Sequence, residues 1–309
     1  MIYIISAILL LVIVLFVFYK MTGSETETIS DASREATNDA FVQLTNGWTH
    51  YELSGPAEGI LVVLVPGMTL QQYVWDYNVA ALTKAGYRVL RYDLIGRGLS
   101  DKPNIVYNTE VFKSQLTELI NKLGVTQPVH IVGLAFGGLV AAQFAETFPE
   151  RVRSLTLMTS DGFGTHLSLG ARLSLAPIIG TYLGHTFGNR IMLKRLDGYS
   201  ADSRVVKEIK QRFTPHLRQK GFKRALLSAL RNMPIYTAEA TFAKIAASKL
   251  PTLILWGEKD VITPLTHAEA IRAVVPGAEF TVFDGLGHMP QYEAPALFNA
   301  RLLQFLNSH

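Results

Sequence analysis

The chain has 309 residues, of which 49% are hydrophobic and 17% charged, with no cysteine and a net charge of +4. Soluble domains carry about 25% charged residues, so this chain is poor in charge. The composition excludes a disordered chain, a disulfide scaffold, a cysteine-ligated zinc site and a thiolate catalyst. The positive charge is small and no finger, RRM or helix-turn-helix pattern accompanies it, so we expect no nucleic-acid partner.

The surplus of apolar residues begins at the N-terminus. Residues 2–19 form a run without a charge, interrupted by Ser6. An 18-residue helix is roughly 27 Å long, which is close to the hydrocarbon thickness of a bilayer. We therefore expect residues 1–20 to form a single-pass transmembrane anchor that localises the protein to a membrane, with Phe18, Tyr19 and Lys20 at the interface.

Two other interpretations of this run stay open. A cleaved secretory signal needs a basic segment before the run and a small-x-small cleavage site, and the sequence has neither. A buried helix of the body is the other alternative. The side of the membrane is undecided because Lys20 and Arg34 lie among four acidic residues. Residues 21–45 are expected to form a polar tether between the anchor and the body.

Beyond residue 46, short β-rich runs alternate with segments of helical periodicity. Near-continuous apolar runs indicate strands covered on both faces, as in a parallel sheet. The alternation predicts a doubly wound α/β fold. The expected strands are residues 60–65, 87–92, 129–132, 154–158, 252–256 and 280–283, and the expected helices are residues 75–85, 110–123, 137–148, 265–275 and 294–307.

One interval breaks this alternation. From residue 163 to residue 246 the sequence predicts several helices and no strand. Such an insertion is expected to form a cap over the carboxyl ends of the strands, where open α/β sheets bind their ligands. The predicted domains are therefore a core of residues 46–162 and 247–309 and a helical cap of residues 163–246.

The first chemical motif follows the strand expected at 129–132. Gly133-Leu134-Ala135-Phe136-Gly137 matches the nucleophile elbow G-x-S-x-G, except that alanine occupies the position of the serine. The flanking glycines are required because the strand-to-helix turn is too tight for larger side chains. Taken alone, this fragment also fits a glycine-rich turn of an ordinary strand–helix unit.

Two loops join the elbow in a resemblance to a known family. Pro66-Gly67-Met68 follows the first long strand, and a D-x-x-G-x-G-x-S loop begins at Asp93. Together these segments resemble the α/β-hydrolase family, in its capped esterase, lipase and carbon–carbon hydrolase branch, over about residues 46–307. The resemblance implies that the backbone N–H groups of Met68 and Phe136 form an oxyanion hole and that Asp93 is structural. Pro66 departs from the histidine that is commoner in the family.

Two later motifs resemble the acid turn and the histidine loop of the same family. A G-x-x-D-x-x-x-P turn contains Asp260, and a G-H-x-x-x-x-E-x-P loop contains His288. The resemblance implies that Asp260 is the carboxylate and His288 the base of a triad, whose order along the chain fits the fold. Asp161, just after the strand at 154–158, is the rival carboxylate. No pair of the other seven histidines has metal-ligand spacing, and we expect no metal or cofactor.

With serine at position 135, the resemblance implies acyl transfer through a covalent intermediate. The methyl group of Ala135 cannot attack a carbonyl, and loss of a triad nucleophile costs on the order of 10⁶ in turnover. We therefore expect this chain to bind its substrate and barely turn it over. Ala135 is either a replacement for serine or the mark of a natural binding protein. The retained Asp260 and His288 favour a replacement.

The expected function is hydrolysis of small lipophilic carboxylic esters, such as monoacylglycerols. Epoxide hydrolases and haloalkane dehalogenases are disfavoured because they need aspartate at the elbow. Two alternatives stay open. One is a carbon–carbon bond hydrolase of ring-cleavage diketones, and the other is a non-catalytic, membrane-tethered receptor for a small hydrophobic ligand. The oligomeric state stays open.

The predicted cap has a charge and a hydropathy pattern of its own. Residues 194–231 contain eleven Lys or Arg against three Asp or Glu, a net charge of +8. This excess predicts that the cap contacts anionic lipid headgroups beside the anchor, although a solvated helix face has the same pattern. The apolar residues 167–187 are expected to line an acyl route into the site, or to pack in the core.

Overall fold

The computed structural model describes the whole chain except residues 1, 38, 165–172 and 174. An eight-stranded sheet in the order β1-β2-β4-β3-β5-β6-β7-β8 forms its centre. The β1–β2 and β2–β4 pairs are antiparallel, and all other neighbouring pairs are parallel. The strands are β1 (Ala40–Leu44), β2 (Gly47–Ser54), β3 (Leu61–Val65), β4 (Arg88–Tyr92), β5 (Val129–Leu134), β6 (Val152–Met158), β7 (Thr252–Gly257) and β8 (Glu279–Phe283).

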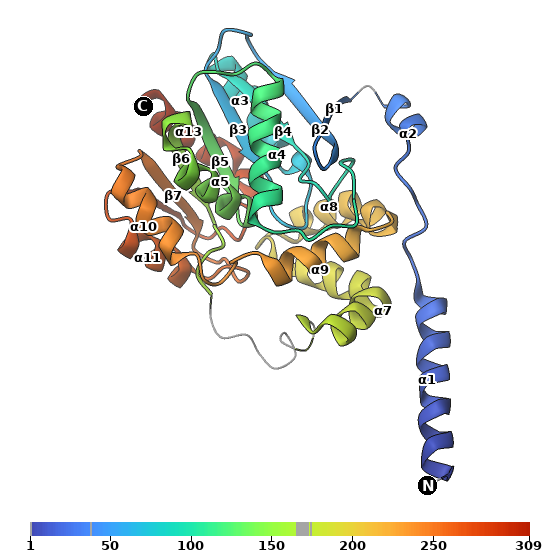
Figure 1. The fold of residues 1–309 in the computed structure, drawn as a ribbon. Coiled ribbons are helices and arrows are strands. Elements are labelled where there is room, and N and C mark those ends of the chain that lie inside the picture. The colour runs from blue at the N-terminus through green and yellow to red at the C-terminus, as the bar shows by residue number, and fades with distance from the viewer. Residues whose placement is uncertain (1, 38, 165–172, 174) are drawn as a thin grey trace.

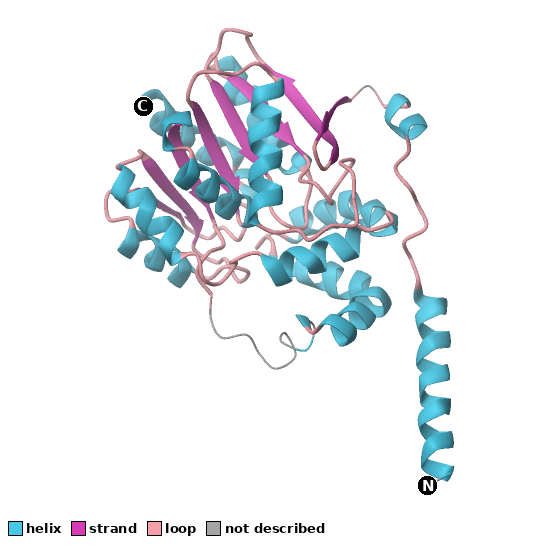
Figure 2. Cartoon of the chain, in the orientation of Figure 1, coloured by secondary structure: helices cyan, strands magenta, loops and turns pink. Residues whose placement is uncertain are grey.

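Helices cover both faces of the sheet (Figure 2). One apolar cluster packs α4, α5, α10 and α11 on one face, and a second packs α3 and α13 on the other. The mostly parallel α/β-hydrolase architecture expected from the sequence is therefore confirmed. The helices of the core are α3 (Asp76–Lys84), α4 (Thr109–Lys122), α5 (Phe136–Thr147), α10 (Glu239–Ser248), α11 (Leu265–Val274), α12 (Pro290–Glu293) and α13 (Pro295–Asn307), with short 3-10 turns at η1 (Gln72–Trp75) and η2 (Pro149–Arg151).

The first two strands were not expected from the sequence. β1 is a half-exposed edge strand, and β2 is buried only at Thr49 and His50. Such strands lack the continuous apolar run on which the prediction of buried parallel strands depends. The boundary predicted at residue 45 between tether and body is therefore wrong, because the sheet begins at Ala40.

The cap lies over the carboxyl ends of the strands, as Figure 1 shows. Its described part is helical, as expected, and consists of α7 (Pro177–Arg195), η3 (Leu196–Gly198), α8 (Ser203–Phe213), η4 (Thr214–Arg218) and α9 (Phe222–Asn232). Part of the apolar stretch predicted as an acyl route, residues 165–172 and 174, lies outside the described residues.

The end of the cap differs from the prediction. The chain leaves and re-enters the core at one place, where the Gly162 N–H donates to the carbonyl of Ile235 and the Ala238 N–H donates to the carbonyl of Gly162, each at 2.8 Å. After this crossing, α10 packs on α5 and α11. The helix α10 therefore belongs to the core, and the cap ends before the boundary predicted at residue 246. The prediction missed this boundary because helical periodicity is present on both sides of the crossing.

The N-terminal helix α1 (Ile2–Thr22) projects from the body (Figure 1). By length and composition it can cross a membrane, and its side chains from Tyr3 to Phe18 are exposed. It is therefore not a core helix of the body. Its last turns contact α7, where the Tyr182 hydroxyl donates to the carbonyl of Leu15 at 3.2 Å and the rings of Tyr19 and His185 stack at 3.8 Å.

The segment after α1 also contacts the cap. The backbone N–H of Lys223 donates to Glu25 at 2.7 Å, and Glu27 pairs with Arg218 at 2.7 Å. The short helix α2 (Asp31–Glu35) follows, and Arg34 pairs with Asp101 of the body. The segment predicted as a polar tether thus docks along the body over part of its length.

A close contact at the end of β7 offers a test of the fold. A Cβ atom on Gly257 would lie 1.9 Å from the carbonyl oxygen of Gly287, in the loop after β8. We expect Gly257→Ala to displace that loop and to lower the free energy of unfolding by about 1–3 kcal/mol, as overpacking does. Gly277→Ala is the matched control because a Cβ there meets nothing within 4 Å. Equal thermal midpoints for the two variants would contradict this packing.

Candidate active site

The turn between β5 and α5 has the geometry of an elbow. Ala135 sits at its apex with φ 50° and ψ −114°, a conformation that costs a residue with a Cβ about 1–3 kcal/mol. A Cβ on Gly133 would lie 2.4 Å from the carbonyl oxygen of Gly137, and one on Gly137 would lie 2.4 Å from that of Pro66. The backbone segments are too close for side chains here, so the turn predicted from the sequence is present.

Backbone N–H groups beside Ala135 point to a site for negative charge. Phe136 is the first residue of α5, so its N–H has no acceptor within its own helix and adds to the positive end of the helix dipole. Met68, in the loop after β3, lines the same cavity as Ala135. Its carbonyl accepts the Nε–H of the buried Arg97 at 2.9 Å. This bond fixes the orientation of the loop to which the sequence analysis assigned an oxyanion donor.

The loop that begins at Asp93 is held together by its first residue. The Asp93 carboxylate accepts the N–H groups of Gln72 and Leu99 at 2.8 and 2.9 Å, and it lies 2.7 Å from the Nδ1 of His50. A Cβ on Gly98 would lie 2.0 Å from the same carboxylate. These contacts give Asp93 a structural role, as the resemblance implied, and it does not line the cavity.

Asp260 and His288 form a hydrogen-bonded pair beneath the cap. The Nδ1 of His288 lies 2.8 Å from Oδ2 of Asp260, and both side chains are buried. The other carboxylate oxygen accepts the N–H groups of Ile262 and Thr263 at 2.8 and 2.9 Å. Burial acts to raise the pKa of Asp260, but His288 and Thr263 outweigh it and hold that pKa below its ordinary value. The carboxylate is therefore ionised, and Nε2 is the imidazole nitrogen available to the cavity.

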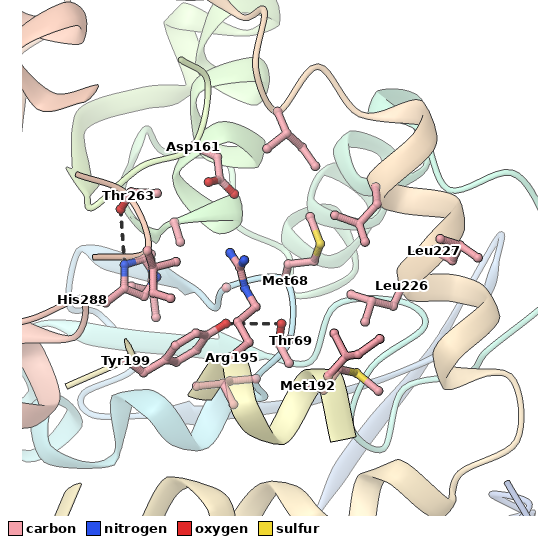
Figure 3. Close-up of a pocket in the computed structure, with 18 of the residues that line it drawn as sticks. Met68, Thr69, Asp161, Met192, Arg195, Tyr199, Leu226, Leu227, Thr263 and His288 are labelled. Atoms are coloured by element: carbon pink, nitrogen blue, oxygen red, sulfur yellow. Dashed lines mark hydrogen bonds between the residues drawn. The ribbon is translucent and has the colours of Figure 1, made fainter. Parts of the chain in front are cut away.

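Two threonines position this pair and were missed by the sequence analysis. The Thr263 hydroxyl lies 2.7 Å from Oδ2 of Asp260 and 3.3 Å from Nδ1 of His288 (Figure 3). The Thr159 hydroxyl donates to the carbonyl of His288 at 3.1 Å. Thr263 lies three residues after Asp260, a spacing at which the carboxylate of an aspartate can accept a local backbone N–H. Thr159 has no comparable local signal because its partner, His288, lies 129 positions later in the chain.

Asp161, the rival carboxylate, lies elsewhere in the cavity wall. Its N–H donates to the carbonyl of Ala135 at 3.1 Å. Burial raises the pKa of Asp161 from its ordinary 3.8 to about 6, while His288 and Arg195 act in the opposite direction. The carboxylate in hydrogen-bond contact with His288 is that of Asp260. Asp161 is therefore a polar group of the cavity wall, placed near the pair of Asp260 and His288 without being part of it.

The cavity above these residues has a volume of about 760 Å³. Ala135 and His288 lie in its floor, and the cap helices α7 and α9 form its upper walls. Most of the cap side chains that line it are apolar or glycine, and they are Gly180, Leu183, Gly184, Gly188, Ile191, Met192, Leu226, Leu227 and Leu230. The cavity is thus an apolar compartment with polar groups gathered at one end.

Four polar residues that the cap contributes to the cavity wall, Arg195, Tyr199, Lys223 and Tyr236, were not found from the sequence. Arg195 extends its guanidinium into the cavity toward Asp161 (Figure 3). The ring of Tyr199 lies 5.1 Å from that of His288, centroid to centroid, and Tyr236 lines the wall. Arg195 was counted among eleven basic residues of the cap, and composition alone does not distinguish a cavity-facing arginine from a solvated one.

Comparisons with known proteins agree with this architecture. A family described as "alpha/beta hydrolase fold" matches residues 60–295. A 2-hydroxy-6-oxononadienedioate/2-hydroxy-6-oxononatrienedioate hydrolase of Paraburkholderia phymatum is 29% identical over 301 residues, 91% of this chain and 99% of its own. Lipase 1 of Psychrobacter immobilis is 30% identical over 217 residues, 68% of this chain and 65% of its own.

Solved structures give the same result. A hydrolase from Pseudomonas aeruginosa PA01 superposes with a TM-score of 0.75 at 26% identity, covering 88% of this chain and 99% of that one. A meta-cleavage product hydrolase from Pseudomonas fluorescens IP01, a serine-to-alanine mutant complexed with acetates, superposes with a TM-score of 0.73 at 25% identity, covering 87% and 97%.

The raised pKa of Asp161 predicts how stability depends on pH. Between pH 3.8 and about 6 the folded chain holds a proton that the unfolded chain has released, so this group lowers stability as the pH rises through that window. We expect Asp161→Asn to gain about 3 kcal/mol over the parent between pH 3.5 and pH 7.5, the equivalent of the raised pKa of Asp161. Thermal unfolding followed by circular dichroism measures this, with the exposed Asp284→Asn as control. Parallel pH curves for Asp161→Asn and the parent would contradict it.

Proposed function

Because the chain belongs to the alpha/beta hydrolase fold family, we propose that its site is built for hydrolysis of lipophilic carboxylic esters by a serine–histidine–aspartate triad, here without the nucleophile. One observation carries this proposal. The Asp260–His288 pair lines the same cavity as Ala135, whose backbone is held at φ 50°. A strained apex beside a carboxylate-bound imidazole is the arrangement that activates a hydroxyl at that apex.

In the serine form, Ala135→Ser, each residue has a defined task. The introduced hydroxyl oxygen attacks the carbonyl carbon of the ester, and Nε2 of His288 takes the hydroxyl proton. Asp260 holds the imidazole tautomer and stabilises the imidazolium. The N–H groups of Phe136 and Met68 bind the oxyanion. The alcohol then leaves with the proton from His288. A water molecule next attacks the acyl carbon and gives a proton to Nε2 of His288, and the bond to the introduced oxygen breaks as that oxygen takes the proton back.

With Ala135 the same site binds and does not react. A methyl group offers no lone pair to a carbonyl and no proton to His288. Residual hydrolysis then rests on oxyanion stabilisation and positioning alone, which is about six orders of magnitude below a complete triad in a serine protease. The cavity and the pair of Asp260 and His288 do not depend on the missing hydroxyl, so substrate binding is retained.

The shape of the cavity supports a lipophilic substrate. About 760 Å³ is ample for a drug-sized ligand or a single acyl chain. The apolar walls from α7 and α9 suit an alkyl chain, whereas Arg195 and Tyr199 place polar groups near His288. This arrangement fits a monoacylglycerol or a similar ester, with the chain between the cap helices and the ester at the floor.

We propose further that α1 anchors the protein in a membrane as a single span. Its length, its charge-free composition up to Lys20 and its exposure along the side of the body support this. A lipophilic ester would be concentrated in the same bilayer.

A second reaction class is favoured by one specific feature. The guanidinium of Arg195 in the cavity suits an anionic carboxylate, and some relatives are named as hydrolases of dioate ring-cleavage products. In a carbon–carbon bond hydrolase, Arg195 would bind a substrate carboxylate. The alanine at position 135 supports a third function, that of a non-catalytic receptor for a small hydrophobic ligand.

Restoring the nucleophile tests the proposal. We expect Ala135→Ser to hydrolyse p-nitrophenyl esters of short and medium acyl chains and to form a covalent adduct with a fluorophosphonate probe, because the hydroxyl would meet His288 and the oxyanion donors. Release of p-nitrophenol and mass spectrometry measure these results. The parent chain should give turnover lower by several orders of magnitude.

The matched control is Ala135→Ser combined with Asp260→Asn, which keeps the hydroxyl and removes the carboxylate that orients His288. This variant should lose most of the restored activity. If the serine form neither hydrolyses esters nor reacts with the probe, the receptor function replaces the proposed one.

Substrate class is tested through Arg195. In the Ala135→Ser background, we expect Arg195→Met to leave KM for a neutral medium-chain ester within about threefold, because the ester contacts apolar walls and the substituted side chain keeps much of its volume. Steady-state kinetics on the ester and on a ring-cleavage diketone acid measure this. Preferred turnover of the diketone, lost with Arg195→Met, would favour the carbon–carbon hydrolase.

A further inference from the structure

The helices α1 and α7 run side by side in the same direction. From the N-terminal toward the C-terminal end of both helices, the Tyr182 hydroxyl first contacts the carbonyl of Leu15. One turn later, Nε2 of His185 contacts the carbonyl of Tyr19 at 3.0 Å. Four residues after His185, Asn189 bonds to Ser24, just after the end of α1, at 3.0 Å. Successive turns of α7 therefore lie level with successive turns of α1.

The distribution of charge changes at the same level in both helices. α1 carries no charged residue before Lys20. In α7 the thirteen residues from Pro177 to Asn189 carry no Asp, Glu, Lys or Arg, and Arg190 and Lys194 follow. The register of contacts places His185 beside Tyr19, so the two helices become basic within about a turn of each other.

The N-terminal end of α7 is apolar and uncovered. Ile178 is 85% exposed and Ile179 is 47% exposed. Ile178 lies about one turn, or about 5.4 Å, before Tyr182 along α7. It is therefore on the N-terminal side of the level of Leu15 in α1. Leu15 is itself inside the predicted membrane span. The isoleucines thus extend in the direction of the apolar half of α1.

We infer that the first two turns of α7, Pro177–Leu183, lie in the apolar interface of the bilayer that α1 crosses. This inference rests on the proposed anchor. The bilayer is the occupant because the charge-free part of α7 lies beside the charge-free part of α1, and basic residues begin at nearly the same level in both helices. Two helical turns are about 11 Å long, so these turns reach the apolar layer while Lys20, Arg190 and Lys194 are placed to meet the headgroups.

The polar groups at this end of α7 are compatible with the interface. Pro177 has no N–H, which removes one unpaired donor at the helix start. Among the described residues, Arg231 is a cation near this end, and it donates to the carbonyls of Leu175 and Ala176 at 2.8 and 2.9 Å and lies 3.4 Å from the Thr181 hydroxyl. Its hydrogen bonds therefore satisfy carbonyls that precede the helix, and a long arginine stem can lie along apolar surface with its head toward the headgroups.

The immersed turns are also a wall of the cavity. Gly180 and Leu183 lie on the opposite side of α7 from Tyr182 and line the apolar end of the cavity. One helix therefore separates the compartment for the acyl chain from the bilayer. This deepens the proposed function, because the ester that such a site receives is one dissolved in the membrane and not one dissolved in water.

The absence of cysteine from the chain makes a direct test simple. The full chain carrying Ile178→Cys is labelled with a nitroxide and reconstituted in vesicles of phosphatidylcholine and phosphatidylglycerol. Power-saturation spectroscopy then compares collisions with oxygen, which concentrates in the bilayer, and with a water-soluble nickel chelate. Leu10→Cys in α1 is the membrane reference. Lys122→Cys, exposed at the end of α4 away from the cap, is the aqueous reference.

We expect the oxygen-to-nickel ratio of Ile178→Cys to approach that of Leu10→Cys and to exceed that of Lys122→Cys. An aqueous ratio at Ile178 with a membrane ratio at Leu10 would overturn this inference and leave the anchor standing. Aqueous ratios at both positions would overturn the anchor as well. Spectral broadening at Ile178 that disappears on dilution with unlabelled chain would assign the surface to a second copy. Catalysis is not read out, so the proposed hydrolysis is tested separately.

Discussion

The close approach of backbone segments around Ala135 is the constraint on which the site depends. Cβ atoms on Gly133, Gly137 and Gly138 would each lie about 2.5 Å or less from atoms of a neighbouring segment. Those neighbours belong to the elbow itself, to the loop after β3 and to the loop after β6. The three glycines therefore let one turn hold two other loops, and these loops carry Met68 and Asp161. The N–H groups of Met68 and Phe136 and the cavity floor are positioned by this close packing around the glycines, to which the side chain of residue 135 does not contribute.

A second contact of the same kind couples the acid and the base. Gly257 ends β7 beside the carbonyl of Gly287, so the turn containing Asp260 and the loop containing His288 are packed against each other before their side chains meet. The strained backbone at Ala135, by contrast, positions a methyl group, which takes no part in acyl transfer. The retained strain, the oriented imidazole and the glycines are the observations behind our proposal that alanine replaces a serine at this position.

Sequence patterns predicted the parts of this molecule that local rules determine. The buried parallel strands and the elbow have continuous apolar runs or required glycines, and the structure places them within a few residues of the predictions. The partly exposed strands β1 and β2, the cap boundary before α10 and the cavity-facing Arg195 depend on which segments meet in space. Thr159 is the clearest case, because its contact with His288 spans 129 positions of the chain.

Some basic residues of the cap form ion pairs within the protein. Arg218 pairs with Glu27, Lys210 with Asp197 and Arg212 with Asp76. Three of the eleven basic residues of the cap therefore fasten it to the segment that leaves α1, to itself and to the core. Lys223 bonds to Ser24 at 2.7 Å and lines the cavity, so the wall of the cavity is joined directly to that segment. The placement of the cap relative to α1 is then determined less by total charge than by the contacts that align α7 with α1.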